Sequence, residues 1–158
     1  MGNIFAGSEV VALGIQIEKN GRDFYNRMAE QSKVLKAREV FRFLTGEEEK
    51  HIKVFQGILD KTRKFEPQGQ DTDEYYAYMN TLAREYIFTQ KDEGEKIAKA
   101  IQTDKEAIEK AISFEKDSVV FYEGLKKIVP DYDVKIIETL IVQEEGHLKQ
   151  LIETKKLL

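Results

Sequence analysis

The chain has 158 residues, of which 41% are hydrophobic and 34% charged, a composition that suits amphipathic helices around one core. A net charge of −4 and the lack of any dense basic stretch argue against a nucleic-acid partner. Cysteine is absent, which excludes a disulfide, a thiolate zinc site and an iron–sulfur cluster, and no apolar run reaches the roughly 18 residues of a membrane span. We therefore expect one domain over residues 1–158, located in the cytoplasm and not in a membrane.

Two long segments in the first half of the chain have the periodicity of amphipathic helices. Apolar residues recur at alternating steps of three and four over about residues 8–31, with Ser8 as the expected N-cap, and again over about 35–64. A short break separates the two segments, so we expect an antiparallel hairpin over about 8–64. Three polar residues lie inside these apolar stripes: Glu18, Glu48 and His51.

A connection of about 40 residues, over 65–102, follows this hairpin. It begins with a cluster of helix-breaking residues around Pro67 and Gly69. Short helical patterns over 75–88 and 94–102 predict a crossover that runs along the bundle. We expect the tyrosines at its centre to pack within the crossover or to contact a dimer partner. These are Tyr75, Tyr76 and Tyr78.

The second half of the chain predicts another helical hairpin, over about 103–157. Its first helix begins near Thr103, which forms a capping-box pattern with Glu106. Its second helix follows Pro130, a residue that the first turn of a helix accepts. The polar residues inside the two apolar stripes include Glu115, Glu144 and His147.

The two halves repeat one chemical pattern. Glu48 and Glu144 each begin a Glu-x-x-His motif, and the only two histidines of the chain, His51 and His147, close these motifs. Residues three apart share a helix face, so each pair points at one place. Each of the four acids lies about 14 residues from the turn of its hairpin, which at about 1.5 Å per residue brings all four to one height. We interpret the chain as a duplicated hairpin with a pseudo-two-fold axis.

Four carboxylates that converge in one core need counter-charge. An ionised carboxylate buried without a partner is very costly, and no Lys or Arg lies beside these acids on the stripes. Two divalent cations would balance four carboxylates, and each imidazole would add one nitrogen ligand, a mixture that suits iron or manganese. The sequence thus predicts two iron ions per chain, or manganese instead. The predicted ligands are Glu18, Glu48, His51, Glu115, Glu144 and His147.

Four further residues on the stripes are candidates for roles beside the metal ions. Tyr25 and Tyr122 lie seven residues after the partner acid of their half, and we expect their hydroxyls to donate to ligand carboxylates; ordinary core packing is the alternative. Gly21 and Ser118 lie one turn after those acids, and we expect these small residues to leave room for a bound oxidant. Glycine inside a helix is unfavourable, and Gly146 has no explanation from the sequence.

Taken together, the paired motifs, the partner acids and the two tyrosines resemble the rubrerythrin-type branch of the ferritin-like superfamily over about residues 8–155. This resemblance implies an all-α, ferritin-like four-helix bundle of two antiparallel hairpins joined by a long crossover. By analogy with such bundles, Glu48 and Glu144 bridge the metal ions, while each remaining acid serves one metal with the histidine of its half. Two features depart from rubrerythrins: the chain lacks a rubredoxin domain with four Cys, and Ser118 stands where they carry an additional Glu.

The resemblance leaves three functions open. The first is a redox enzyme that reduces hydrogen peroxide or oxygen with electrons from a separate donor, such as a rubredoxin-like protein. The second is a ferroxidase that handles or stores iron, and the third is a non-enzymatic metal-binding helical module. No side chain is a good candidate for a covalent nucleophile, which argues against hydrolysis. We further expect a homodimer.

Overall fold

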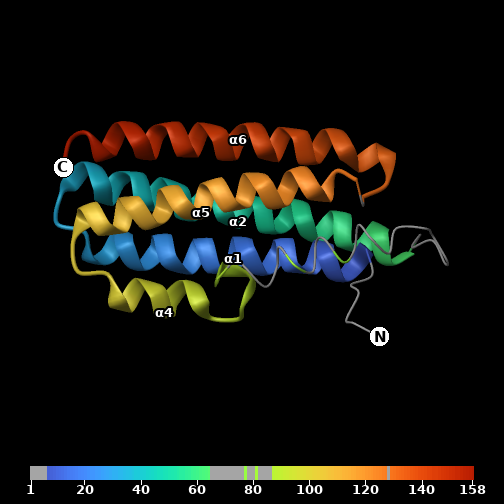
Figure 1. The fold of residues 1–158 in the computed structure, drawn as a ribbon, viewed down its shortest axis with the longest axis horizontal. Helices are drawn as coiled ribbons and strands as arrows, with labels where there is room; N and C mark the ends of the chain where they lie inside the picture. Colours follow the sequence, from blue (N-terminus) through green and yellow to red (C-terminus); the bar gives the residue numbers. More distant parts are fainter. Residues whose placement is uncertain (1–6, 65–76, 78–80, 82–86, 128) are drawn as a thin grey trace.

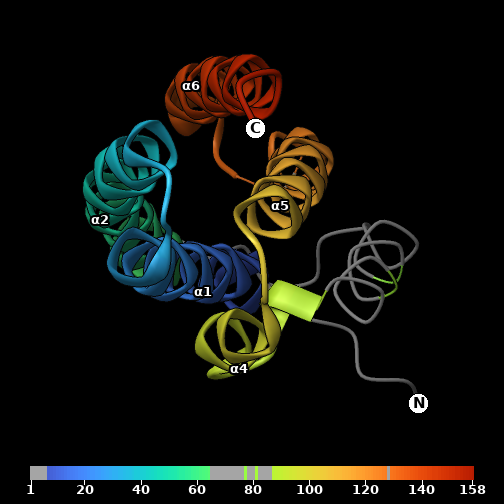
Figure 2. The ribbon, with the colours of Figure 1, turned by 90° about the vertical axis from the view of Figure 1, so that its left-hand side faces the viewer.

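Four long helices dominate the computed structural model, which describes residues 7–64, 77, 81, 87–127 and 129–158 (Figure 1). The first antiparallel hairpin consists of α1 (Gly7–Gln31) and α2 (Leu35–Lys64), and the second of α5 (Asp104–Leu125) and α6 (Asp131–Lys155). Seen along the bundle axis, the four helices surround a common centre, with α1 and α6 each flanked by α2 and α5 (Figure 2). The described residues contain no strand, and the prediction of an all-α bundle of two hairpins is confirmed.

The predicted stripes form the core of this bundle. The apolar stripe residues are buried, with exposed fractions of at most 6%. Burial of each large apolar side chain contributes about 1.5–3 kcal/mol, which is how periodicity alone specifies the bundle. The buried apolar stripe residues, tyrosines included, are Val11, Ile15, Tyr25, Met28, Phe41, Leu44, Phe55, Ile58, Ile108, Ala111, Tyr122, Leu125, Ile137, Leu140 and Leu151.

Part of the crossover lies on the outer side of α1. The 3-10 helix η1 (Ile87–Thr89) and helix α4 (Glu93–Ala100) follow α1 outside the ring of four helices (Figures 1 and 2). The helix expected over 94–102 thus corresponds to α4. Most of the segment 75–88, with its three clustered tyrosines, lies outside the described residues.

Asn20 of α1 fastens this crossover to the bundle, a role that the sequence did not predict. The side chain is fully buried and donates to the backbone carbonyls of Phe88 at 2.5 Å and Gln90 at 2.6 Å. It also accepts a hydrogen bond from the backbone N–H of Gly94 at 3.2 Å. Only glycine fits at position 94, because a Cβ there would lie 1.9 Å from the carbonyl oxygen of Asn20.

The starts of the helices agree with the capping signals in part. Thr103 is the N-cap of α5 and accepts from the N–H of Glu106 at 3.1 Å, as the capping-box pattern predicts. The Glu106 carboxylate, however, accepts from Gln102 rather than from Thr103. Pro130 takes the N-cap position of α6, and Ser8 lies within the first turn of α1 because this helix already includes Gly7.

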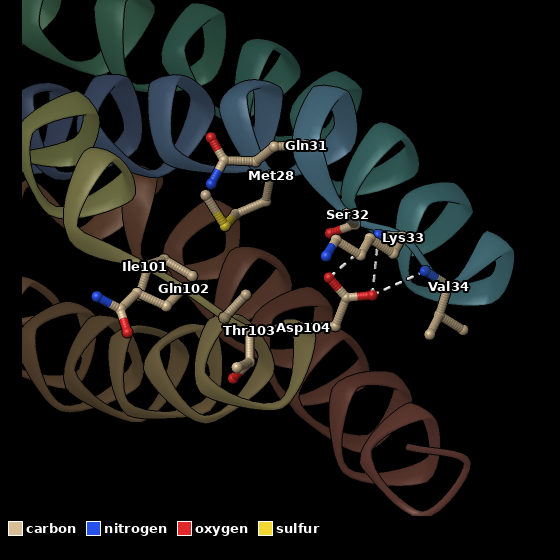
Figure 3. Close-up of a pocket in the computed structure, with 10 residues that line it drawn as sticks. Met28, Gln31, Ser32, Lys33, Val34, Ile101, Gln102, Thr103 and Asp104 are labelled. Carbon is tan, nitrogen blue, oxygen red and sulfur yellow. Dashed lines mark hydrogen bonds between the residues drawn. The ribbon is translucent and has the colours of Figure 1, made fainter.

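Asp104 joins the two hairpins at one end of the bundle. Its carboxylate accepts hydrogen bonds from the backbone N–H groups of Lys33 at 3.0 Å and Val34 at 2.7 Å (Figure 3). These groups precede the first turn of α2, whose free N–H groups and helix dipole favour a negative charge. The first residue of α5 thus caps α2 beside a surface pocket.

No helix in the described part of the chain has an apolar stretch long enough to cross a bilayer.

Candidate metal centre

Four glutamates meet in the middle of the bundle, one from each long helix. Glu18 comes from α1, Glu48 from α2, Glu115 from α5 and Glu144 from α6, and all four are 0% exposed. Each is held there by the apolar residues that precede and follow it on its stripe. Two pairs of antiparallel helices with equal spacing to their turns thus bring four acids to one level of the core.

The acids and the two histidines form two groups of four residues. The first group is Glu18, Glu48, His51 and Glu144, and the second is Glu48, Glu115, Glu144 and His147. Within each group, one ligand atom per residue lies within 4.8 Å of all the others. Glu48 and Glu144 belong to both groups, so the geometry provides two adjoining positions that share two carboxylates.

Both imidazoles turn the same ring atom toward the acids. Nδ1 of His51 lies 2.7 Å from Oε1 of Glu144 and 3.4 Å from Oε2 of Glu18. Nδ1 of His147 lies 3.5 Å from Oε2 of Glu144 and 3.9 Å from Oε1 of Glu115. The two rings stack with their centroids 5.8 Å apart, and both side chains are almost fully buried. Each half therefore supplies one nitrogen to its own group.

Many of these polar atoms have no hydrogen-bond partner among the described residues, although they are buried. The 2.7 Å approach of His51 to Glu144 lacks the geometry of a hydrogen bond. Leaving a buried polar atom unpaired costs about 1–3 kcal/mol, and more for a charged group, whereas oxygen and imidazole nitrogen together fit a pair of divalent cations. The unpaired atoms are Oε2 of Glu18 and Glu115, both Oε atoms of Glu48 and Glu144, and Nδ1 of His51 and His147.

Comparison with known proteins gives the same assignment. The family model described as Rubrerythrin matches residues 9–155. The chain belongs to the rubrerythrin family. A solved structure from Thermotoga maritima, provisionally described as a ferritin-like diiron-carboxylate protein, superposes with a TM-score of 0.69 at 24% identity, covering 99% of this chain and 98% of that one. This likeness confirms the ferritin-like fold. None of the curated proteins matches the chain significantly in sequence.

Two tyrosines of this rubrerythrin-family chain bind Glu18 and Glu115, the two glutamates that each belong to only one of the four-residue groups. The hydroxyl of Tyr25 donates to Oε1 of Glu115 at 2.6 Å, and that of Tyr122 donates to Oε1 of Glu18. Burial, together with the nearby carboxylates, raises the pKa of both tyrosines well above their usual value, so both keep the proton that they donate. Each tyrosine thus orients an acid of the opposite hairpin.

The acids of the cluster differ in their affinity for protons. Burial raises the pKa of Glu48 and of Glu115 well above the usual range, and the charge of Glu144 raises both further. For Glu144, burial raises the pKa, but contacts with Glu115 and both histidines outweigh burial and lower it. Burial also lowers the pKa of His51, yet contacts with Glu144 and Glu18 outweigh it and raise this pKa to about 11. The cluster therefore retains protons unless cations replace them.

Gly21 and Ser118 lie beside the centre in different surroundings. The ring of Phe114 takes the space next to Gly21, because a Cβ there would lie 2.6 Å from Cζ of that ring. Oγ of Ser118 is buried without a hydrogen-bond partner among the described residues, and it borders a cavity of about 10 Å³ that Phe88 and Phe114 also line. This volume is close to the minimum that holds one water molecule. The cavity beside Ser118 thus has room for at most about one water molecule, whereas Phe114 fills the space beside Gly21.

Several residues around the centre were not predicted from the sequence. Phe114 and Phe88 pack against each other with ring centroids 4.3 Å apart, and Phe114 fills the space beside Gly21. Gln143 lies 2.9 Å from Nε2 of His51, on the side of the ring away from the acids. Glu47 lies off the apolar stripe, where the sequence predicts a solvated residue or one that supports the ligands, and its Oε1 is 3.7 Å from Nε2 of His147. Alignment of the two halves could have found Gln143, because it precedes Glu144 as Glu47 precedes Glu48.

Proposed function

We propose that this rubrerythrin-family protein is a di-iron redox protein that reduces hydrogen peroxide or oxygen. The observation that supports this proposal is the pair of four-residue groups, buried at the centre of the bundle, that share Glu48 and Glu144. Two ferrous ions bound there would supply the two electrons that, with two protons, convert one hydrogen peroxide into two waters. Family membership supports the same class of chemistry.

Each residue of the centre has a defined part in this proposal. Glu18 and His51 would hold one iron, and Glu115 and His147 would hold the other. Glu48 and Glu144, which belong to both four-residue groups, would serve both irons. All six side chains are almost fully buried, so bulk water is kept from the ligands and charges interact more strongly than at the surface.

The tyrosines serve this site by fixing carboxylates and by holding protons. Tyr25 and Tyr122 each donate to an oxygen of an acid that belongs to only one group, which leaves the other oxygen of that acid, Oε2, for a metal ion. Their hydroxyl groups keep the protons that they donate to these acids. Ser118, one turn after Glu115, borders a small cavity that Phe88 and Phe114 also line, and we assign this side as the approach for peroxide or oxygen.

Electrons for continued turnover come, in this proposal, from a separate donor. The chain has no Cys and so has no rubredoxin-type iron site of its own. A small rubredoxin-like protein fits this role, because it could approach the bundle and transfer one electron at a time. The expected homodimer also stays a prediction.

The proposal is tested by loading the protein with iron without oxygen, reducing it, and adding one hydrogen peroxide per chain. We expect the protein to bind about two irons per chain and a single equivalent of peroxide to oxidise both. Optical spectroscopy in a stopped-flow instrument records this oxidation. Glu144→Gln should abolish stoichiometric iron binding, whereas Glu145→Gln, an exposed neighbour, should not change it. Less than half an iron per chain in the unaltered protein, or a reduced centre that ignores both peroxide and oxygen, would refute the redox proposal.

One observation favours a second function, ferroxidase or iron handling. Rubrerythrins carry an additional Glu at the position of Ser118. Here the serine offers no carboxylate to a metal ion, and its hydroxyl borders a small cavity instead. A centre that reacts with oxygen much faster than with peroxide, and that takes up iron beyond two per chain, would support this alternative. Metal that binds without any redox reaction would instead indicate a non-enzymatic metal-binding module. If the protein binds manganese in preference to iron, manganese takes the place of iron in the proposal.

A further inference from the structure

The two imidazoles at the centre have different partners on their outer sides. With Nδ1 directed at the acids, Nε2 of each ring faces a residue of the opposite hairpin. Nε2 of His51 lies 2.9 Å from the amide oxygen Oε1 of Gln143. Nε2 of His147 lies 3.7 Å from the carboxylate oxygen Oε1 of Glu47. One ring therefore faces a neutral amide and the other a carboxylate.

These two partners occupy equivalent places in the duplicated hairpins. Glu47 immediately precedes Glu48 on α2, and Gln143 immediately precedes Glu144 on α6. Exchanging the halves therefore converts the contact between His51 and Gln143 into the contact between His147 and Glu47. Glutamine and glutamate have nearly the same shape but differ in charge; the Gln143 side chain is also more exposed and lies closer to its imidazole than Glu47 does.

An imidazole that binds a metal ion through Nδ1 carries its proton on Nε2. The acceptor of that proton fixes the tautomer and the orientation of the ring, and it changes how strongly Nδ1 donates to the metal. At 3.7 Å, the Glu47 carboxylate lies beyond hydrogen-bond distance from Nε2 of His147 and stabilises the Nε2 proton through its negative charge, which the neutral amide of Gln143 lacks. We propose that Glu47 and Gln143 are positioning residues for the two imidazoles, and that this acid-for-amide difference makes the metal position of His147 the tighter of the two.

The surroundings of Glu47 preserve its effect on His147. The other carboxylate oxygen, Oε2, pairs with Nζ of Lys50 at 3.0 Å, but that lysine side chain is 76% exposed and the pair is screened by water. The Glu47 side chain itself is only 18% exposed. The ring of Phe43 contacts His147 edge-on, with centroids 6.0 Å apart, and shields another side of the imidazole. The charge on Oε1 of Glu47 therefore acts on His147 in a partly dehydrated place, at a separation of 3.7 Å.

The two histidines allow each metal position to be followed separately. Labelling the imidazole rings with ¹⁵N yields signals from only two residues, and zinc, which is redox-inert, can be added stepwise while these signals are recorded by NMR. Phe43→Leu assigns them, because loss of the aromatic ring changes the signal of His147 and not that of His51. In the unaltered protein, we expect the signal of His147 to reach its bound position at a lower zinc concentration than that of His51.

Charge exchange between the two positions is the decisive comparison. Glu47→Gln should weaken zinc binding at His147 by about tenfold, so that the two positions fill together, and Gln143→Glu should strengthen binding at His51 by a similar factor. The protein with both substitutions has the same composition as the unaltered one, and in it His51 should fill first. A residue that merely maintains the fold would not reverse the order of filling, and circular dichroism confirms that each variant is folded.

This inference depends on the proposed di-metal centre, and the experiment separates the two. Zinc bound at fewer than two positions in the unaltered protein would overturn the centre itself, and the inequality with it. Two zinc ions that bind with the same order and affinities in all four proteins would overturn the role of Glu47 and Gln143 alone.

Discussion

The hydroxyl of Tyr122 donates a hydrogen bond to Glu18, an acid that lies on the other hairpin of the bundle. Tyr25 and Glu115 form the reciprocal pair at 2.6 Å. Because each bond crosses from one half of the chain to the other, the two tyrosines join the hairpins at the level of the metal centre. The same bonds occupy one oxygen of each acid and so direct the other toward the cluster.

Replacing Tyr122 by Phe removes this donor and leaves the ring in place against Phe55, which is 5.0 Å away between centroids. Oε1 of Glu18 then loses its partner, so we expect metal affinity to fall by about tenfold or more, and the metal-free protein to lose about 1–3 kcal/mol of unfolding free energy. Competition with a chelator and chemical denaturation measure the two effects. Tyr132→Phe, at an exposed position, is the matched control and should change neither.

The four long helices and the meeting of six side chains could be predicted because both depend on spacing along the chain. A stripe at steps of three and four determines which face of a helix is buried, and equal distance from a turn determines height in a hairpin. His51 is three residues from Glu48, so their shared direction needs no information from the rest of the fold. Local geometry therefore predicted that these residues meet, whereas their division into two groups that share Glu48 and Glu144 was expected only from the resemblance.

Contacts between segments that are distant in sequence could not be predicted in this way. Asn20 bonds to Phe88 and Gly94, which lie 68 and 74 residues further along the chain, and its own neighbourhood gives no sign of them. The position of Phe114 beside Gly21 depends on how closely α5 packs against α1. The crossing of the tyrosine bonds likewise follows from the way in which the hairpins face each other.

The metal-free protein should become less stable as pH rises from neutral to alkaline. The pKa of Glu48 and of Glu115 is raised in the fold by burial and by neighbouring charge, so the ionised form opposes folding once pH exceeds the usual value of 4.5. Contacts with Glu144 and Glu18 raise the pKa of His51 from 6.5 to about 11, so its stabilising charge is present below pH 6.5 and lost as pH approaches 11. Both effects act in the same direction above neutrality.

Thermal denaturation between pH 6 and pH 10, in the presence of a chelator, measures this trend. The same series with manganese or zinc bound is the control, because the cations replace the protons and compensate the carboxylates. We expect the melting temperature of the metal-free protein to fall with pH and that of the metal-bound protein to change much less. Parallel curves would show that the cluster does not control stability in this range.

Gly21→Ala should destabilise the protein and disturb the metal centre. The added Cβ would lie 2.6 Å from the ring of Phe114 and 3.4 Å from Oε2 of Glu48, so the ring has to move within a packed core. Such overpacking costs about 1–3 kcal/mol of unfolding free energy. Gly146→Ala is the matched control, because no atom lies within 4 Å of its added Cβ, and there we expect a gain of about 0.5–1 kcal/mol. Urea denaturation of both variants tests whether they change stability in opposite directions.

Asn20→Ala should release the crossover from α1 without removing any proposed metal ligand. Three hydrogen bonds are lost, and the carbonyls of Phe88 and Gln90 and the N–H of Gly94 lose their partner. We expect hydrogen exchange to become faster in α4 (Glu93–Ala100), with little change in α6 (Asp131–Lys155). Asn26→Ala, at an exposed position of the same helix, should leave exchange unchanged.

Release of the crossover should also alter the reaction of the centre. Phe88 packs against Phe114 and lines the cavity beside Ser118, so movement of η1 should open this cavity. Metal affinity should stay the same in Asn20→Ala, because the six proposed ligands lie on α1, α2, α5 and α6. The rate of oxidation by peroxide should rise, because the path through the small cavity widens. An unchanged rate together with faster exchange in α4 would show that the oxidant approaches the cluster from another side.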